Sequence, residues 1–312
     1  MRFELTADQR DFMTSLDRLI SASDPIAVNR AWGEGDTAPG LALWKQLAAM
    51  GVPALLEDAS PVELVCAFEV LGRHVVPGPW IESAAYLATA LSGDAHAAVA
   101  EGAVATVAIP LALDADIADI VYRAPEFCGT VHRSDEKSGA SARRIRASVD
   151  PSRRLFEVEA AEPLESVDID RAQDLASLAA AAELLGAGER VLADAVEYVK
   201  QRTQFGRQIG SYQAIKHHLA NVRIALDFAR PLVHGAAVDP SPRAVSAAKV
   251  QAGEAARLAA RIGLQVHGAI GYTAEYDLSR WLLRIRALDS AWGTRAAHRS
   301  RLLTLLTATE PS

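Results

Sequence analysis

The sequence is poor in the residues from which many binding and redox sites are built. It has only two cysteines among 312 residues, Cys66 and Cys128, and their spacing is not C-x-x-C. This excludes a disulfide framework and a cysteine-based zinc site, and we expect both thiols to be buried and reduced. Aromatic residues make up only 6% of the chain. No uninterrupted apolar run is long enough to span a membrane.

A surplus of positive charge is also missing. The formal net charge is −7, and only five of the 32 basic residues are lysines. Because nucleic-acid binding depends on neutralising phosphates, this balance argues against it as the main role. The first residues, Met1 to Thr6, contain no apolar segment typical of a secretory signal. We therefore expect a cytoplasmic protein with no nucleic-acid or membrane partner.

The residues that are present predict a globular, mainly helical protein. Half of the chain is apolar, less than a quarter is charged, and alanine accounts for about a fifth of all residues. Three zones differ in pattern and predict three domains. They are an N-terminal helical domain (1–100), a reduced β domain (101–168) and a C-terminal helical bundle (169–312).

The N-terminal zone carries clear signals for helix ends. Thr6 followed by Gln9 has the spacing of a capping box, and Ser60 precedes a proline at the first position of another helix. Gly72 is the predicted end of that second helix. The predicted helices are one beginning after Thr6, 41–50, 61–71 and 80–91.

The middle zone has the pattern of short strands. Residues 104–109 and 120–122 are rich in β-branched side chains, while 144–149 and 155–159 alternate polar with apolar residues. Residues 133–143 are polar and contain glycine and serine, which predicts a loop.

Long helices return in the last zone. Their predicted ranges are 174–202, 212–230 with an end near Pro231, 242–265 capped by Ser241, 277–291 and 294–306. Helices of this length with apolar stripes favour an antiparallel four-helix bundle.

Two segments of the bundle contain more polar and small residues than packing requires. The first, residues 202–213, reads Arg-Thr-Gln-Phe-Gly-Arg-Gln-Ile-Gly-Ser-Tyr-Gln and joins two long helices. An arginine and amide side chains at a rigid corner can hold a pyrophosphate or the edge of an adenine. The alternative is a polar loop between helices.

The second segment, residues 265–276, reads Gln-Val-His-Gly-Ala-Ile-Gly-Tyr-Thr-Ala-Glu-Tyr. Its small residues allow close approach to the backbone, and the helix that follows presents an N-terminus to an anion. Because the segment follows a helix rather than a strand, it is not a Rossmann motif. The alternative is a glycine cap and a simple connection.

Together the two segments resemble motifs of the acyl-CoA dehydrogenase family. The family pattern R-x-x-F-G-x-x-I…Q is matched at Arg202, Phe205, Gly206, Ile209 and Gln213. The pattern Q-x-x-G-G-x-G-[FY]-x-x-E-[FY] is matched at Gln265, Gly268, Gly271, Tyr272, Glu275 and Tyr276, with Ala269 replacing one glycine. The resemblance is strong over 172–308, moderate over 1–75 and weak in between. It implies a mainly α fold with a small β module: an N-terminal helical domain, a truncated middle β domain and a C-terminal four-helix bundle.

The resemblance also implies a chemistry, and this chain departs from it at the catalytic base. Family members use FAD to oxidise the Cα–Cβ bond of an acyl-CoA thioester, while a carboxylate removes the α-proton. Trp292 and Ala176 stand at the two positions where family members carry that carboxylate. Neither side chain can abstract a proton. Glu183 and Glu189 are nearby in sequence and could be displaced bases, although they lie about two or more helical turns from Ala176 along the predicted helix.

The middle zone departs as well, because residues 76–165 contain neither the T-E-P…G-S-D loop nor the W-[IV]-[TS]-N strand that hold the flavin ring in the family. In the family the adenosine diphosphate half of FAD is bound by the neighbouring subunit, through the two motifs that this chain keeps. The chain thus lacks the base and the flavin-ring motifs, which act within one subunit. It keeps the two motifs that bind the FAD of the neighbouring subunit.

The resulting hypothesis is a subunit of a heteromeric acyl-CoA dehydrogenase that itself lacks the base. Arg202 would bind the pyrophosphate of a shared FAD, and Gln204 and Phe205 its adenosine half. The rest of the implied cofactor site is Gln213, Gln265, Val266, His267 and Gly268. A full-length subunit would supply the base and the flavin cradle in an α2β2 assembly of the type found in actinobacterial steroid degradation. The resemblance to that type implies an acyl-CoA substrate, for example a steroid-derived one. Two rivals remain: a self-sufficient homo-oligomeric dehydrogenase with a displaced base, and a flavin-free scaffold.

Overall fold

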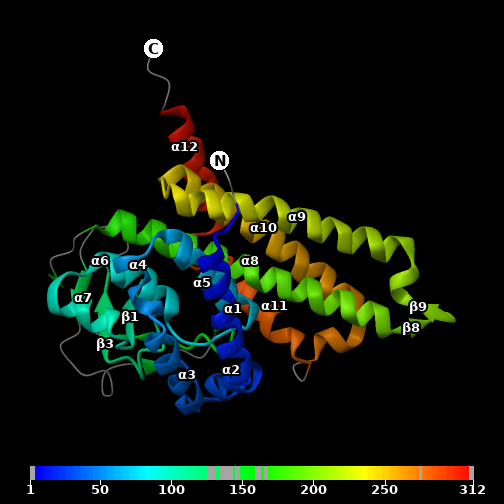
Figure 1. Ribbon diagram of the computed structural model, residues 1–312, viewed down its shortest axis with the longest axis horizontal. Helices are drawn as coiled ribbons and strands as arrows, with labels where there is room; N and C mark the ends of the chain where they lie inside the picture. Colours follow the sequence, from blue (N-terminus) through cyan, green and yellow to red (C-terminus); the bar gives the residue numbers. More distant parts are fainter. Residues whose placement is uncertain are drawn as a thin grey trace.

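The computed structural model describes residues 4–124, 131–133, 143–144, 148–158, 163–164, 168–273 and 276–308. Figure 1 shows an N-terminal group of helices and a small sheet on one side, and long helices on the other. The predicted composition of mainly helix with a small β module is confirmed. Cys66 is a buried free thiol, as expected, and burial raises its pKa to about 12. Cys128 lies outside the described residues.

The N-terminal helices are packed around tryptophan and leucine side chains. They are α1 (Ala7–Ala22), α2 (Pro25–Glu34), α3 (Ala38–Ala49), α4 (Leu55–Asp58), α5 (Pro61–Arg73), the π-helical η2 (Ile81–Leu87), α6 (Ala88–Ala90) and α7 (Gly93–Ala100), with a 3-10 turn η1 (Val52–Ala54). The predicted capping box of α1 is present, since the Thr6 hydroxyl accepts from the Gln9 amide at 3.2 Å. Helix α2 was not predicted, although Asp24 caps it and Pro25 opens it.

Helix α5 corrects one sequence prediction. Ser60 caps the helix as expected, but Gly72 does not end it. A Cβ atom on Gly72 would lie 2.1 Å from the carbonyl oxygen of Glu183 on helix α8 (Ile169–Gln201). Gly186 of α8 is equally close to the backbone of Glu69 on α5. These glycines are therefore needed for the close approach of two helices, not for a helix end.

The small sheet has seven strands in the order β5-β6-β2-β1-β3-β4-β7. The strands are β1 (Ala105–Ala108), β2 (Ala112–Leu113), β3 (Ile120–Arg123), β4 (Val131–Arg133), β5 (Arg143–Arg144), β6 (Leu155–Glu157) and β7 (Pro163–Leu164). Strands β1 and β3 are parallel, and the other pairs are antiparallel. The predicted strands 104–109, 120–122 and 155–159 each contain an observed strand, whereas β2, β4 and β7 were not predicted. Of the predicted loop 133–143, the end residues Arg133 and Arg143 belong to β4 and β5, and residues 134–142 lie outside the described residues, as do residues 145–147 of the predicted strand 144–149.

The C-terminal half is a helical bundle in which α8 lies at the centre. Helix α9 (Gln213–Val238), helix α10 (Pro242–His267) and helix α11 (Leu278–Leu288) pack with it, while α12 (Arg295–Thr307) packs on α10 and projects away (Figure 1). The predicted cap of α10 is correct, because the Ser241 hydroxyl accepts from the Ala244 amide at 3.3 Å.

The predicted end of α9 near Pro231 is wrong. The helix continues through Pro231 to Val238, although proline removes one backbone hydrogen bond. Leu226 and Ala229 before the proline, and Val233 after it, are fully buried. Burial of this stripe on both sides of Pro231 outweighs the local cost, since helices in proteins owe most of their stability to packing.

A buried ion cluster links the N-terminal helices, the β module and the bundle. The Arg284 guanidinium on α11 donates to Asp150 at 2.6 Å and to Glu183 at 2.6 Å. It also donates to the carbonyl of Val76 and to the hydroxyl of Ser152. Arg284 holds the pKa of Asp150 below its usual value although burial acts in the opposite direction. Hydrogen bonds and ion pairs to the buried guanidinium of Arg284 thus connect the three parts of the chain.

Candidate functional site

The first motif folds into a small hairpin at the end of the bundle. Strands β8 (Thr203–Gln204) and β9 (Arg207–Gln208) pair antiparallel and project beyond α8 and α9 (Figure 1). Phe205 and Gly206 form the two-residue turn, with φ values of 52° and 78°. Positive φ at both positions is the geometry of a type I′ hairpin turn. The corner expected between the two long helices is therefore a hairpin whose tip carries an aromatic ring.

The side chains of this hairpin face outward. Arg202, Gln204, Phe205 and Gln213 are all exposed, and Phe205 has 91% of its surface accessible. Among the described residues, no hydrogen bond or ion pair engages the guanidinium of Arg202. Arg207 differs, because its guanidinium lies 3.9 Å from the centre of the Tyr212 ring. Arg202 is thus left available for a ligand while its neighbour stabilises the turn.

The second motif lies at the same end of the bundle. Helix α10 ends at His267, and Gly268 follows with φ 64° and open space where a Cβ would stand. The Tyr198 ring, one turn before Arg202, stacks on His267 with ring centres 4.3 Å apart. This contact joins the two motifs. Beside them is a hollow of about 530 Å³, lined by Arg261, Leu264, Gln265, Gly268, Ala269 and Tyr272.

Two residues of the predicted cofactor site do not present their side chains there. Val266 and His267 are buried, and the His267 Nδ1 hydrogen bonds the carbonyl of Gly263 at 2.7 Å. The imidazole is held between Tyr198 and Tyr276. Only their backbone could reach a bound cofactor, whereas Gln265 and Gly268 are exposed as a cofactor site requires. Glu275 of the same motif lies outside the described residues.

The exposed groups at this end suit a diphosphate. Arg202 provides an unpaired guanidinium, which can bind two phosphate oxygens at once. Gln204 and Gln265 provide amides, and Gly268 allows close approach to the backbone. The residues present therefore fit the adenosine diphosphate half of FAD. We call these exposed residues of 202–213 and 265–272 the bundle-end surface.

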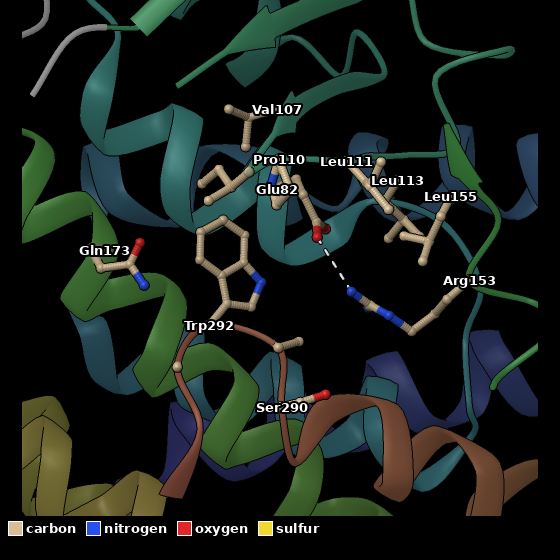
Figure 2. A pocket seen from close by; sticks show the side chains of 13 residues that line it. Glu82, Val107, Pro110, Leu111, Leu113, Arg153, Leu155, Gln173, Ser290 and Trp292 are labelled. Carbon is tan, nitrogen blue, oxygen red and sulfur yellow. Dashed lines mark hydrogen bonds and ion pairs between the residues drawn. The ribbon is translucent and has the colours of Figure 1, made fainter. Parts of the chain in front are cut away.

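The two family base positions lie elsewhere. Ala176 is fully buried on α8. Trp292 lines a separate pocket of about 320 Å³ between α8, η2 and the β module, shown in Figure 2. Neither position carries a group that can accept a proton.

The two carboxylates considered as displaced bases are engaged in ion pairs. Glu183 accepts from Arg284 at 2.6 Å inside the buried cluster. Glu189 accepts from Arg223 and from Arg230, both at 2.6 Å, and these arginines hold its pKa below the usual value against the effect of burial. Neither lines the pocket of Trp292.

Sequence reasoning missed the one carboxylate that does line this pocket. Glu82 is buried on η2, and its Oε1 lies 3.4 Å from Nη2 of Arg153. Burial raises the pKa of Glu82, although Arg153 opposes the shift. No motif marks Glu82 in the sequence, because only the packing of η2 against the sheet brings it opposite Trp292.

Other kinds of site are not seen in the part of the chain that the structure describes. That part contains no group of three or more His, Cys, Asp or Glu side chains arranged to hold a metal ion. Its helices include none that is long and apolar enough to cross a membrane.

Comparison with known proteins gives consistent matches. The family described as "Acyl-CoA dehydrogenase, C-terminal domain" matches residues 173–305. The chain is 34% identical over 276 residues to the acyl-CoA dehydrogenase IpdE2 of Mycobacterium tuberculosis, covering 83% of this chain and 85% of that protein. This match extends over the N-terminal and middle zones as well as the bundle.

Solved structures show the same fold. The ChsE4-ChsE5 complex from Mycobacterium tuberculosis contains a chain that matches with a TM-score of 0.80 at 21% identity, covering 100% of both chains. The Tcur3481-Tcur3483 steroid acyl-CoA dehydrogenase matches with a TM-score of 0.83 at 20% identity, covering 96% of this chain and 98% of the other. The resemblance and the fold class expected from the sequence are confirmed.

Proposed function

This chain belongs to the acyl-CoA dehydrogenase family, and from that premise we propose that it is the FAD-completing subunit of a heteromeric acyl-CoA dehydrogenase. In this proposal the bundle-end surface binds the adenosine diphosphate half of an FAD whose ring is held by a full-length partner subunit. The partner also supplies the base, and the complex is α2β2. The bound flavin would accept the hydride that leaves the β-carbon of a CoA thioester.

One observation carries the proposal: the family motif is exposed at the bundle end while both base positions are occupied by inert side chains. Arg202 is free of described partners and Phe205 stands on a projecting turn with φ 52°. A bulky exposed ring in a left-handed conformation is costly for an isolated subunit. A partner surface that buries the Phe205 ring would offset this cost, which favours a subunit that works in a complex.

In this arrangement the residues of the chain bind and orient rather than react. The Arg202 fork would neutralise the pyrophosphate, and Gln204 and Gln265 would hydrogen bond the adenosine half. The backbone around His267 and Gly268 would pack against it, and Gln213 would support the hairpin from the start of α9. The α-proton would go to a carboxylate of the partner.

The comparisons support a partner and a substrate class without identifying either. The ChsE4-ChsE5 and Tcur3481-Tcur3483 structures are complexes of two named chains, and the second is described as a steroid acyl-CoA dehydrogenase. By analogy, the substrate proposed here is a steroid-derived acyl-CoA.

The test is FAD titration of the deflavinated complex formed with a full-length dehydrogenase subunit encoded nearby. Arg202→Ala should raise the dissociation constant of FAD about tenfold or more, because a charge-assisted hydrogen bond is lost, and Arg202→Lys should restore part of it. Arg243→Ala is the matched control. Arg243 is also exposed, but it lies roughly 36 Å along α10 from His267.

Other outcomes would favour the rivals. Stoichiometric flavin and turnover in the purified single chain would support a self-sufficient enzyme. A complex that forms and binds FAD equally with Ala or Arg at position 202 would contradict the proposed cofactor role. A chain that binds neither FAD nor a dehydrogenase subunit would support a scaffold.

A further inference from the structure

The pocket beside Trp292 has the features of a ligand site that the proposed FAD role does not use. It is enclosed by η2, the turn between β1 and β2, residues 153–155 and the loop after α11. Six of its lining residues have large aliphatic side chains: Val107, Ile109, Pro110, Leu111, Leu113 and Leu155. In Figure 2 the carboxylate of Glu82 and the guanidinium of Arg153 approach each other on one side, and the indole of Trp292 forms another wall.

Glu82 brings an unused acceptor to this pocket. Its side chain is 6% exposed, and Oε2 has no hydrogen-bond partner among the described residues. The contact of Oε1 with Arg153 is long, at 3.4 Å. Native structures rarely leave a buried polar atom unsatisfied, so an exception at the edge of a pocket points to a ligand atom that completes it.

The backbone around Glu82 is also unusual. Residues Ile81–Leu87 form a π-helix, a form that occurs mostly as short insertions and frequently at functional sites. Because the wider turn changes the direction of each side chain relative to an α-helix, it sets where the Glu82 carboxylate points. Tyr86, on the same π-helix, contacts the Trp292 ring with centres 5.2 Å apart.

Trp292 lies in a strained loop that hydrogen bonds from neighbouring helices hold in place. Its φ is 56°, and its carbonyl accepts from the Ser177 hydroxyl and is bonded by the His298 ring, both at 3.0 Å. The Lys249 Nζ donates to the carbonyls of Leu288 and Ala291 at 2.6 and 2.9 Å. These hydrogen bonds fix the backbone of the loop that carries the indole, and strained residues of this kind cluster at ligand clamps.

The polar groups define the ligand. Glu82 and Arg153 together carry no net charge, so a charged ligand would be left without a compensating partner in a largely apolar pocket. A hydroxyl group can donate to Glu82 Oε2 and accept from the Arg153 guanidinium at the same time. Two uncharged polar groups, the Gln173 amide and the Ser290 hydroxyl, also line the pocket, and the rest of its surface is aliphatic or indole, which suits a largely saturated carbon skeleton.

We propose that this pocket binds an uncharged aliphatic or alicyclic alcohol, with its hydroxyl between Glu82 and Arg153 and its carbon skeleton against Trp292 and the leucines. The site is independent of FAD and of the partner subunit. With Trp at the base position, the bound molecule is not oxidised by this chain. The pocket is therefore a binding site rather than a second catalytic centre.

The test uses the full chain with cyclohexanol as the probe. Binding is followed by saturation-transfer NMR and by the fluorescence of Trp292, identified by its loss in Trp292→Phe. We expect saturable binding of cyclohexanol. Cyclohexanone cannot donate to Glu82 and cyclohexanecarboxylate adds an unpaired charge, so each should bind about tenfold more weakly.

Two substitutions separate the site from non-specific binding. Glu82→Met removes the acceptor at similar volume and should weaken cyclohexanol binding about tenfold, while Glu82→Gln should retain part of it. Leu111→Trp, on the turn beside the pocket, should fill the space and abolish binding even if Glu82→Met does not fold. Leu303→Trp, on the exposed face of α12, is the matched control and should bind normally.

Three results would overturn the proposal. They are the absence of saturable cyclohexanol binding, equal affinities for cyclohexanol and cyclohexanone, and unchanged affinity in Leu111→Trp. None of these bears on FAD, whose titration in the complex tests the bundle-end surface separately.

Discussion

Charged side chains have opposite environments in the interior of this protein and at the bundle end. In the interior, Arg284 is matched by Asp150 and Glu183, and Arg230 by Glu69 and Glu189. At the bundle end, Arg202 has no partner among the described residues and Phe205 is almost fully exposed. The interior charges hold the fold together, while the exposed ones are available for binding. A carboxylate near a family catalytic position in sequence is thus a poor candidate base when arginines already pair with it, as they do with Glu183 and Glu189.

The largest expected effect comes from breaking the interior cluster. Arg284→Ala leaves Asp150 and Glu183 buried without a cation and should lower the free energy of unfolding by about 3–5 kcal/mol. Urea denaturation followed by circular dichroism measures this. Arg286→Ala, on the exposed face of the same helix, is the control and should change stability by less than about 0.5 kcal/mol. If both variants lowered the free energy of unfolding by similar amounts, the buried ion cluster would not be a main source of stability.

The close contact between α5 and α8 gives the next effect. A Cβ on Gly186 would lie 1.9 Å from the carbonyl oxygen of Glu69, which cannot move without shifting α5. Gly186→Ala should therefore lower the free energy of unfolding by about 1–3 kcal/mol despite the better helix propensity of alanine. Gly253→Ala is the control, because its Cβ would meet side-chain atoms rather than backbone, at 3.0 Å from the flexible Arg295 side chain and 3.3 Å from the Asp289 carboxylate. If Gly186→Ala were as stable as the native protein, the two helices could separate without cost.

The buried lysine behind the Trp292 loop gives a pH-dependent effect. Burial lowers the pKa of Lys249 from 10.5 to about 7. Between these values the unfolded chain binds a proton that the folded chain does not, so this group makes stability rise with pH. The stability difference between the native protein and Lys249→Met should change by up to about 1.4 kcal/mol per pH unit between pH 8 and 10.

Exposed Lys216 is the control for this titration. Lys216→Met should follow the native pH dependence throughout. Parallel curves for the native protein and Lys249→Met would mean that Lys249 stays charged in the folded state.

The smallest effect on stability is expected at the bundle end. Arg202→Ala removes an exposed side chain without described partners and should change the free energy of unfolding by less than about 0.5 kcal/mol. Phe205→Gly should be neutral or slightly stabilising, because glycine accepts φ 52° without strain. Thermal unfolding of the single chain measures both. A loss above about 1 kcal/mol in either variant would mean that the hairpin braces the bundle.

The sequence predicted the helical skeleton well where local chemistry decides it. The capping residues Thr6, Ser60 and Ser241 mark real helix starts because a side chain satisfies free backbone amides wherever it precedes a helix. The sequence-based predictions failed at Gly72 and Pro231, where local propensity favours the end of a helix. Gly72 instead allows α5 and α8 to pack closely, and at Pro231 the packing of α9 outweighs the cost of the lost hydrogen bond.

The candidate site divides in the same way. Arg202, Gln204, Phe205, Gln213, Gln265 and Gly268 were implied by the resemblance to the family motifs, and the structure leaves all of them exposed at one end of the bundle. The burial of Val266 and His267 could not be foreseen, because it depends on which face of α10 meets Tyr198 and Tyr276. Glu82 carries no sequence signal at all.

By itself the sequence determined the family, the helix starts and the motif residues, since each depends on a short run of neighbouring residues. The tertiary structure alone decided which charges remain available. Arginines from other helices pair with Glu183 and Glu189, whereas Arg202 has no partner among the residues that the structure describes. Glu82 faces a pocket that η2, the sheet and the Trp292 loop build together. Electrostatic pairing and burial depend on distances across the fold, and those distances exist only once the helices have packed.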